Sequence, residues 1–139
     1  MPIGLDVKDH EFVTDNAIRY SCYYHVVFCT KYRRSVLNDD MQSLIKNVIY
    51  ENQGAYGYKI LQIETAPDHI HLVITIPPTT SISAMVGKIK RFLVGKVEAE
   101  YPSLQSRLPN LWTRATFVAS SGHVTLGPIN EFIRDQIGV

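Results

Sequence analysis

The chain has 139 residues and a formal net charge of +1, with 45% hydrophobic and 19% charged residues. This length suits one domain with a single core, and the composition is that of a soluble globular protein. No apolar run is long enough to span a membrane, and the N-terminus lacks the pattern of a signal peptide. We therefore expect one cytoplasmic domain over residues 1–139, whose near-neutral charge neither requires nor excludes a nucleic-acid partner.

The first half of the chain predicts a strand, a helix and a second strand after an irregular arm at residues 1–18. Residues 20–30 are dense in aromatic and β-branched side chains, which are typical of strands. Asn38 can cap a helix whose apolar residues recur at helical spacing to about residue 52. Residues 58–65 alternate in polarity and predict the next strand.

The second half predicts two strands and two helices. Residues 69–76 form a strand that makes a hairpin with the strand before it, and residues 82–100 form a helix capped by Ser81. A fourth strand at 111–120 precedes a terminal helix that begins near residue 125. The order β-α-β-β-α-β is that of an α+β, ferredoxin-like (split βαβ) fold, an antiparallel sheet with two helices on one face.

The two cysteines of the chain, Cys22 and Cys29, fall seven residues apart in one predicted strand. An odd spacing places them on opposite faces, so they are poorly placed to form a disulfide. Two reduced thiols are typical of a cytosolic protein.

Two histidines alternate with apolar residues in the third strand. His69 and His71 share a face because side chains in a strand repeat every two residues, so they can hold one metal ion or simply face solvent. On the terminal helix, Gln136 lies one turn after Phe132 and can supply an amide oxygen. Two imidazoles and one oxygen, with positions left open for a phosphate, suit Mg²⁺ or Mn²⁺ acting as a Lewis acid. A structural zinc is not expected, because no third histidine or cysteine follows at the spacing of a zinc finger.

Basic residues gather at two places, the end of the first strand and the helix at 82–100. Basic residues interleaved with an aromatic ring can contact phosphates and stack on bases, although a solvated strand end or helix face explains each cluster too. In the fourth strand Trp112 and Arg114 share a face, with a core role as the alternative for the tryptophan. The candidates for nucleic-acid contact are Lys31, Tyr32, Arg33, Arg34, Lys88, Lys90, Arg91, Lys96, Trp112 and Arg114.

In their order and spacing these features resemble the single-tyrosine HUH transposases of the smallest bacterial and archaeal insertion sequences, which move as single-stranded DNA. The similarity extends from about residue 20 to residue 136. The matching motifs are His25-Val26-Val27-Phe28 with Lys31-Tyr32-Arg33, Pro67-Asp68-His69-Ile70-His71-Leu72, Ser81-Ile82-Ser83, Leu111-Trp112-Thr113-Arg114, and Ile129-x-x-Phe132-Ile133-x-x-Gln136.

The resemblance implies a single HUH-type transposase domain. It implies that His69, His71 and Gln136 bind Mg²⁺ or Mn²⁺ and that position 132 carries the nucleophilic tyrosine. This tyrosine attacks a DNA phosphate, which gives a 5′-phosphotyrosine and a free 3′-hydroxyl. The resemblance also implies binding of hairpins at the ends of a single-stranded element. It further implies a homodimer in which the terminal helix of one subunit can complete the site of the other.

This sequence departs from the family at position 132, because Phe132 has no hydroxyl. We therefore expect the chain to be defective in cleavage. An engineered Tyr→Phe change explains the difference, and so does natural loss of cleavage in a domesticated protein that still binds hairpins. Without the resemblance, the histidine pair predicts a small ferredoxin-like hydrolase.

Overall fold

The computed structural model describes residues 2–4, 12–15, 17–104, 108–120 and 123–139. Within these residues no helix is long and apolar enough to cross a membrane. Both cysteines are free, as expected.

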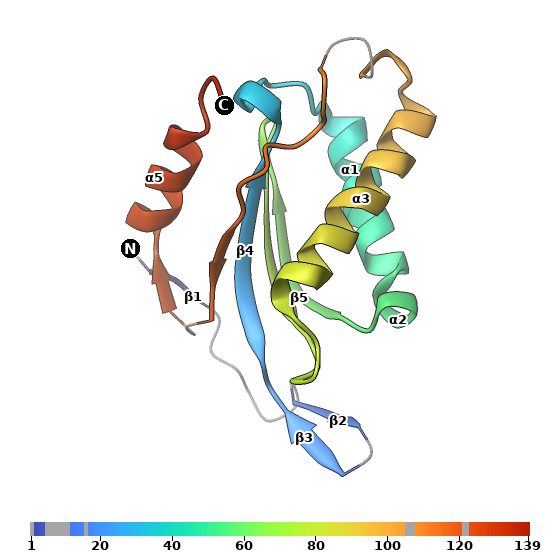
Figure 1. Cartoon of the computed structure of the whole chain (residues 1–139), viewed down its shortest axis with the longest axis vertical. Helices are drawn as coiled ribbons and strands as arrows, with labels where there is room; N and C mark the ends of the chain where they lie inside the picture. The colour runs from blue at the N-terminus through green and yellow to red at the C-terminus, as the bar shows by residue number, and fades with distance from the viewer. Residues whose placement is uncertain (1, 5–11, 16, 105–107, 121–122) are drawn as a thin grey trace.

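A four-stranded antiparallel sheet forms the centre of the fold, in the order β5-β6-β4-β7 (Figure 1). The central strand β4 (Tyr23–Cys29) pairs with β6 (His69–Thr75) on one side and with β7 (Phe117–Ala119) on the other. Strand β5 (Lys59–Thr65) pairs with β6, with a bulge between Ile60 and Gln62. This order confirms the predicted ferredoxin-like arrangement.

The two long helices begin where the sequence predicts them. Helix α1 (Asp39–Glu51) is capped by the side chain of Asn38, and α3 (Ile82–Glu100) is capped by Ser81. A short unpredicted helix, α2 (Gln53–Tyr56), follows α1.

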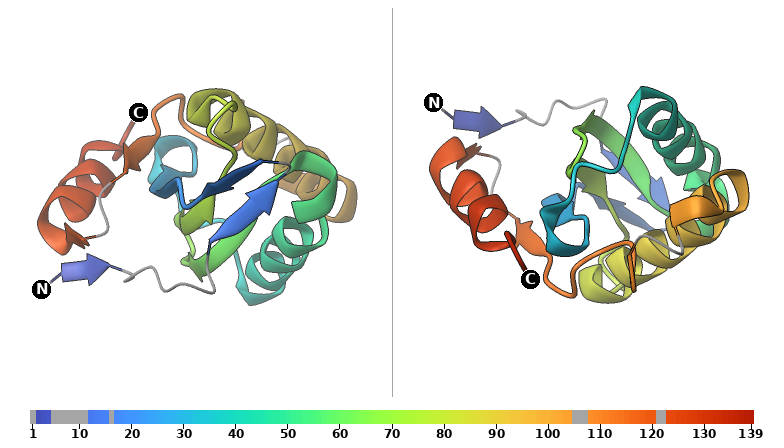
Figure 2. Two further views of the ribbon diagram at one scale, coloured as in Figure 1. Left: turned by 90° about the horizontal axis from the view of Figure 1, so that it is seen from below. Right: turned by 90° about the horizontal axis from the view of Figure 1, so that it is seen from above.

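The helices lie on two sides of the sheet. Figure 2 shows α1 and α3 together on one side and α5 (Leu126–Asp135) on the other. Alternation along β4 and β6 assigns the side chains to these two faces. Val26 and Phe28 belong to the large apolar core under α1 and α3, whereas Val27 packs with Ile129 under α5. Helix α5 therefore covers the face that carries His69 and His71.

The expectation of an irregular arm at residues 1–18 is wrong for the part that the structure describes. Strand β1 (Pro2–Gly4) pairs with β8 (His123–Thr125), and β2 (Val13–Asp15) forms a hairpin with β3 (Ile18–Tyr20). Strands of three residues are too short to show a period in the sequence. The long first strand accordingly begins at Tyr23, after β3, rather than at Tyr20.

The fourth strand is much shorter than the predicted 111–120. Only residues 117–119 pair as β7, and the preceding segment touches the sheet through a single bridge between Thr30 and Trp112. The carbonyl of Thr113 instead accepts a hydrogen bond from Lys90 on α3. Trp112 is buried whereas Arg114 is exposed, and both residues line one groove beside α3.

Candidate metal and DNA site

The histidine pair opens into a pocket of about 360 Å³ between the sheet and α5. Strand pairing sets Val27 and Glu64 on either side of His71. The pocket is lined by Arg33, Glu64, Asp68, His69, His71, Ile129, Asn130 and Ile133. The fold thus brings both predicted histidines into one hollow, with two carboxylates beside them.

The side chain of Asp68 holds His69 in place. Its Oδ1 lies 2.8 Å from Nδ1 of His69, and its Oδ2 lies 3.1 Å from Nε of Arg33. Arg33 in turn donates from Nη1 to the carbonyl of Ile133 on α5, at 3.4 Å. A carboxylate on one ring nitrogen leaves the other, Nε2, free to bind a metal, which is the usual arrangement around metal-binding histidines.

His71 lies deeper and contacts a second histidine. Its Nε2 is 3.3 Å from Nδ1 of His25, and the two rings stack with centroids 5.5 Å apart. Its Nδ1 is 3.6 Å from Oε2 of Glu64. Burial lowers the pKa of both His25 and His71, and the carboxylate of Glu64 opposes part of that effect at His71. Both rings are therefore neutral at neutral pH, which is the form that binds metals.

The donor chemistry at Gln136 fits a cation. The residue is buried just beyond the end of α5, and its Oε1 has no hydrogen-bond partner among the described residues. Such an orphaned buried oxygen is costly unless a ligand satisfies it. No three His, Cys, Asp or Glu side chains within the described residues are arranged to hold a metal, and Gln136 is not among the residues that line the histidine pocket.

Phe132 lies apart from this pocket. Its ring packs against the cluster of Val27 and Ile129 and lies 5.9 Å, between centroids, from the ring of Phe117 on β7. It is not among the residues that line the histidine pocket. In this arrangement of α5, position 132 faces the sheet beside the site.

The basic cluster after β4 forms a 3-10 turn, η2 (Lys31–Arg33), with an exposed tyrosine. Tyr32 and Arg33 both adopt left-handed backbone conformations, with φ of 59° and 52°. Hydrogen bonds that tie Tyr32 to Gly138 and Val139 hold this turn. Lys31 Nζ lies 5.2 Å from the Tyr32 ring centroid and Arg34 Cζ lies 5.9 Å from it. An exposed aromatic ring with two cations near it is a suitable surface for an unpaired base.

The basic residues of α3 fall into two groups, those that are exposed and one that bonds to another part of the fold. Lys88, Arg91 and Lys96 are exposed. Lys90 is half-buried, and its Nζ donates to the carbonyl of Thr113 at 2.9 Å and to Oγ1 of Thr116 at 3.2 Å. Burial lowers the pKa of this lysine. Among the predicted contacts, Lys90 and Arg33 thus hold the fold together.

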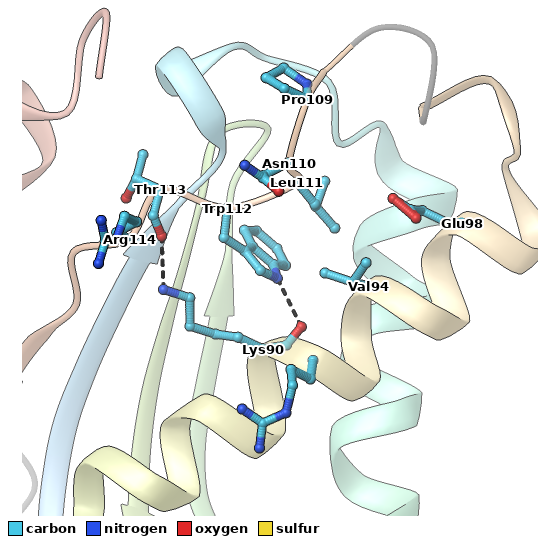
Figure 3. Close-up of a pocket in the computed structure, with 10 residues that line it drawn as sticks. Lys90, Val94, Glu98, Pro109, Asn110, Leu111, Trp112, Thr113 and Arg114 are labelled. Atoms are coloured by element: carbon cyan, nitrogen blue, oxygen red, sulfur yellow. Dashed lines mark hydrogen bonds between the residues drawn. The ribbon is translucent and has the colours of Figure 1, made fainter.

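Trp112 takes the core role that the sequence left as an alternative. Its Nε1 donates to the carbonyl of Lys90 at 3.2 Å (Figure 3). Its ring meets Phe28 edge-on, with the ring centroids 4.8 Å apart. A groove of about 340 Å³ runs beside it between α3 and residues 109–114, with Arg91 and Arg114 among its lining residues.

Three polar residues of the histidine pocket, Glu64, Asp68 and Asn130, escaped the sequence analysis as site residues, and so did His25, which contacts His71 from β4. Glu64 reaches the pocket only through strand pairing with the histidine strand, and Asn130 through the packing of α5. Asp68 was read only as part of a turn and a motif. Its position one residue before His69 was the available signal, because a carboxylate next to a metal-binding histidine commonly orients it.

Similarity to known proteins agrees with this geometry. The family model described as "Transposase IS200 like" matches residues 18–136. The ISDra2 transposase TnpA of Deinococcus radiodurans is 27% identical over 119 residues, covering 84% of this chain and 85% of that protein. The transposase for insertion sequence element IS200 of Salmonella typhimurium is 28% identical over 121 residues, covering 86% of this chain and 79% of that protein.

Solved structures show the same fold. A putative transposase from Deinococcus radiodurans superposes with a TM-score of 0.82 at 24% identity, covering 91% of this chain and 99% of that one. A REP-associated tyrosine transposase bound to a REP hairpin gives a TM-score of 0.55 at 15% identity, covering 86% and 68%. With the family model matching most of its length, this chain belongs to the IS200-like family of transposases, which are DNA-cleaving enzymes.

Proposed function

We propose that this chain binds hairpin ends of single-stranded DNA through an intact HUH site and that, as it stands, it does not cleave them. The observation that carries the proposal is the contrast within one site. His69 and His71 line the pocket with their hydrogen-bond partners in place, whereas position 132 carries a ring without a hydroxyl.

His69, His71 and Gln136 are the residues that would hold Mg²⁺ or Mn²⁺. The bound ion would supply Lewis-acid polarisation of a DNA phosphate. The protein's own part is to keep both imidazoles neutral by burial and to orient His69 through Asp68. Arg33 links Asp68 to Ile133, which lies one turn before Gln136, and so connects the histidine strand to the end of α5.

A tyrosine at position 132 would complete the chemistry that this chain lacks. Its oxygen would form a bond to phosphorus while the bond to the 3′ oxygen breaks, and the 3′ oxygen would leave as a hydroxyl. The phosphotyrosine link conserves the energy of the phosphodiester, so rejoining by the reverse attack needs no other energy source. Phe132 has no atom that can make this bond.

DNA contact is proposed for the cations and the ring that the fold leaves accessible. They lie on η2, on α3 and in the segment before β7. Lys90, Arg33 and Trp112 are left out because they hold the fold together. The proposed DNA-contact residues are Lys31, Tyr32, Arg34, Lys88, Arg91, Lys96 and Arg114. Phosphate contacts supply affinity, and stacking on Tyr32 orders an unpaired base.

We further propose that residues 1–139 form one HUH-type domain that acts as a homodimer in the cytoplasm of a bacterium or archaeon. The position of Phe132 supports completion of the site in trans. Within one chain the ring packs over β4 and β7, outside the histidine pocket. If α5 came from the partner subunit instead, position 132 would lie elsewhere relative to the histidine pocket.

The Phe132→Tyr variant tests the proposal. The purified variant is incubated with Mn²⁺ and a labelled single-stranded hairpin with its flanks, and a covalent adduct is sought on a denaturing gel. We expect an adduct with Phe132→Tyr and none with the parent chain. Phe117→Tyr is the matched control, because it adds a hydroxyl to the neighbouring ring on β7 and should give no adduct.

The alternative function, a non-catalytic and domesticated hairpin-binding protein, rests on the close packing of Phe132 in the α5 cluster. It predicts tight hairpin binding by the parent chain and no adduct with Phe132→Tyr. Absence of both binding and cleavage would overturn the two functions together.

A further inference from the structure

Two residues beyond α5, Gly138 and Val139, clamp the turn that carries Tyr32. The N–H of Tyr32 donates to the carbonyl of Val139 at 2.8 Å, and the N–H of Gly138 donates to the carbonyl of Tyr32 at 3.4 Å. We call residues 138–139 the tail. Figure 1 shows the C-terminal end of the chain beside η2. Both backbone polar groups of Tyr32 are therefore bonded to a segment that lies far away in the sequence.

The turn needs such support because two consecutive residues in it adopt a conformation that side chains disfavour. The φ angles of Tyr32 and Arg33 are 59° and 52°. Residues other than glycine visit this left-handed region at a cost, and they stay in it only where their surroundings hold them. Arg33 is held by its N–H bond to the carbonyl of Thr30 at 2.8 Å and by side-chain bonds to Asp68 and Ile133. For Tyr32 the support is the tail.

This backbone conformation fixes the ring of Tyr32 at the surface. The residue is 39% exposed, and the cations of Lys31 and Arg34 lie within 6 Å of the ring centroid. Because the backbone sets the direction of the Cα–Cβ bond, a change in φ at Tyr32 would move the ring away from this position. A ring that is already in place loses less conformational freedom when it stacks on a base, which favours binding.

The tail is held by its backbone and not by apolar packing. Ile137 and Val139 are 59% and 48% exposed. Gly138 has a φ of 76°, where an L side chain is strained, and a Cβ at this position would meet no atom of the described residues within 4 Å. A substitution of Gly138 would therefore disturb the backbone of the tail without a steric clash.

We propose that Gly138 and Val139 are positioning residues for Tyr32, and that they hold its ring where it stacks on an unpaired base of the bound single strand. The inference rests on the proposed DNA-binding function and extends it to residues outside the predicted contact set. It places the unpaired flank of the hairpin beside the end of α5. Because coupling between two binding events is reciprocal, a base stacked on Tyr32 stabilises the tail in turn.

Hydrogen exchange of the Tyr32 amide, followed by nuclear magnetic resonance, tests the clamp in the free protein. In the parent chain this amide should exchange slowly, because it is bonded to Val139. Gly138→Val should speed the exchange by about tenfold or more, since a β-branched residue is strained at a positive φ. Gly57→Val is the matched control and should leave the exchange unchanged. Gly57 also has a positive φ and open space for a Cβ, and it ends α2, away from η2 (Figure 1).

Binding of a fluorescent single-stranded hairpin with an unpaired thymidine flank tests the effect on stacking. Anisotropy titrations are made in EDTA, so that no divalent ion bound through Gln136 contributes. Tyr32→Ala should weaken binding by about fivefold or more, as loss of one stacked base does. Gly138→Val should weaken binding by a similar factor, and it should add nothing in the Tyr32→Ala background. Gly57→Val should bind as the parent does.

The outcomes separate this inference from the function beneath it. Unchanged exchange of the Tyr32 amide in Gly138→Val, or additive effects of Gly138→Val and Tyr32→Ala, would overturn the inference and leave hairpin binding in place. Equal weakening by Gly57→Val would assign the effect to stability and would overturn it as well. No hairpin binding by the folded parent chain would overturn the proposed function and the stacking role together.

Discussion

The face of the sheet under α1 and α3 differs in kind from the face under α5. The first buries a continuous core that includes Val26, Phe28 and Leu72, with both helices contributing apolar stripes. The second buries only a small apolar cluster around Val27 and Ile129, and beside it lies the pocket of His69 and His71. Adjacent residues of the same two strands thus build the large core on one side and line the histidine pocket on the other.

This difference explains how unsatisfied polar atoms are tolerated. A buried polar atom without a partner costs free energy, and His25 Nε2 and Gln136 Oε1 are two such atoms. The large core under α1 and α3 supplies stability that can offset them. The comparison therefore predicts that changes on the two faces have separable effects, and four experiments test this prediction.

The largest effect is expected at His71 on the α5 face. In the Phe132→Tyr background, His71→Ala should abolish metal-dependent adduct formation while hairpin binding, measured by gel shift, persists. The reason is that the change removes a metal donor and leaves the exposed cations of α3 untouched. Loss of hairpin binding as well would show that His71 is needed for the structure, and would contradict the division between the faces.

On the other face, Ile45→Ala in α1 should lower the free energy of unfolding by about 2–5 kcal/mol, because the side chain is fully buried in the large core. Urea denaturation measures the change. Ile133→Ala, in the half-buried cluster under α5, should cost less and serves as the comparison. Equal losses at the two positions would show that the α5 face contributes to stability as much as the core does.

The buried histidines make stability depend on pH. Burial lowers the pKa of His25 and of His71 in the folded chain, so the unfolded chain binds more protons below the ordinary value of about 6.5. Stability is then full above that pH and falls as the pH drops through it, by at most about 1.4 kcal/mol per pH unit for each histidine. Urea denaturation of the metal-free protein at pH 7.5 and pH 5.5 measures this fall, and His25→Asn should reduce it. An equal fall in that variant would assign the effect to other groups.

The smallest effect is expected from single cations of α3. Arg91→Ala should weaken hairpin binding and reduce the slope of log affinity against log salt by about 1, as loss of one phosphate contact does. Lys90→Met should leave the slope unchanged, because Lys90 donates to Thr113 and Thr116 instead. Titrations by fluorescence anisotropy at several salt concentrations measure both slopes. If the affinity of the parent chain for the hairpin did not depend on salt concentration, the proposal that α3 contacts DNA would be wrong.

Much of the fold could be predicted from the sequence because its signals are local. Asn38 and Ser81 cap their helices, and β-branched runs mark β4 and β6. Alternation along β6 was enough to put His69 and His71 on one face. The motifs added the family, which the match over residues 18–136 confirms.

Short pairings could not be predicted, because their partners lie far away in the chain. Strand β1 exists through β8, more than a hundred residues later, and residues 111–113 bond both to the end of β4 and to Lys90 on α3. Neither contact leaves a periodic trace in the sequence. Tertiary contacts compete with local propensity, and at these places they prevailed.

The candidate residues for the proposed chemistry could be named from the sequence alone: two histidines at a spacing of two and a glutamine on the terminal helix, with a phenylalanine at the position where the resemblance implies the nucleophile. Their surroundings depend on the tertiary structure. Strand pairing set Glu64 and His25 against the two nitrogens of His71, and burial keeps those rings neutral. Hydrogen bonds and dielectric surroundings depend on distances between segments far apart in the chain, and these distances exist only after folding.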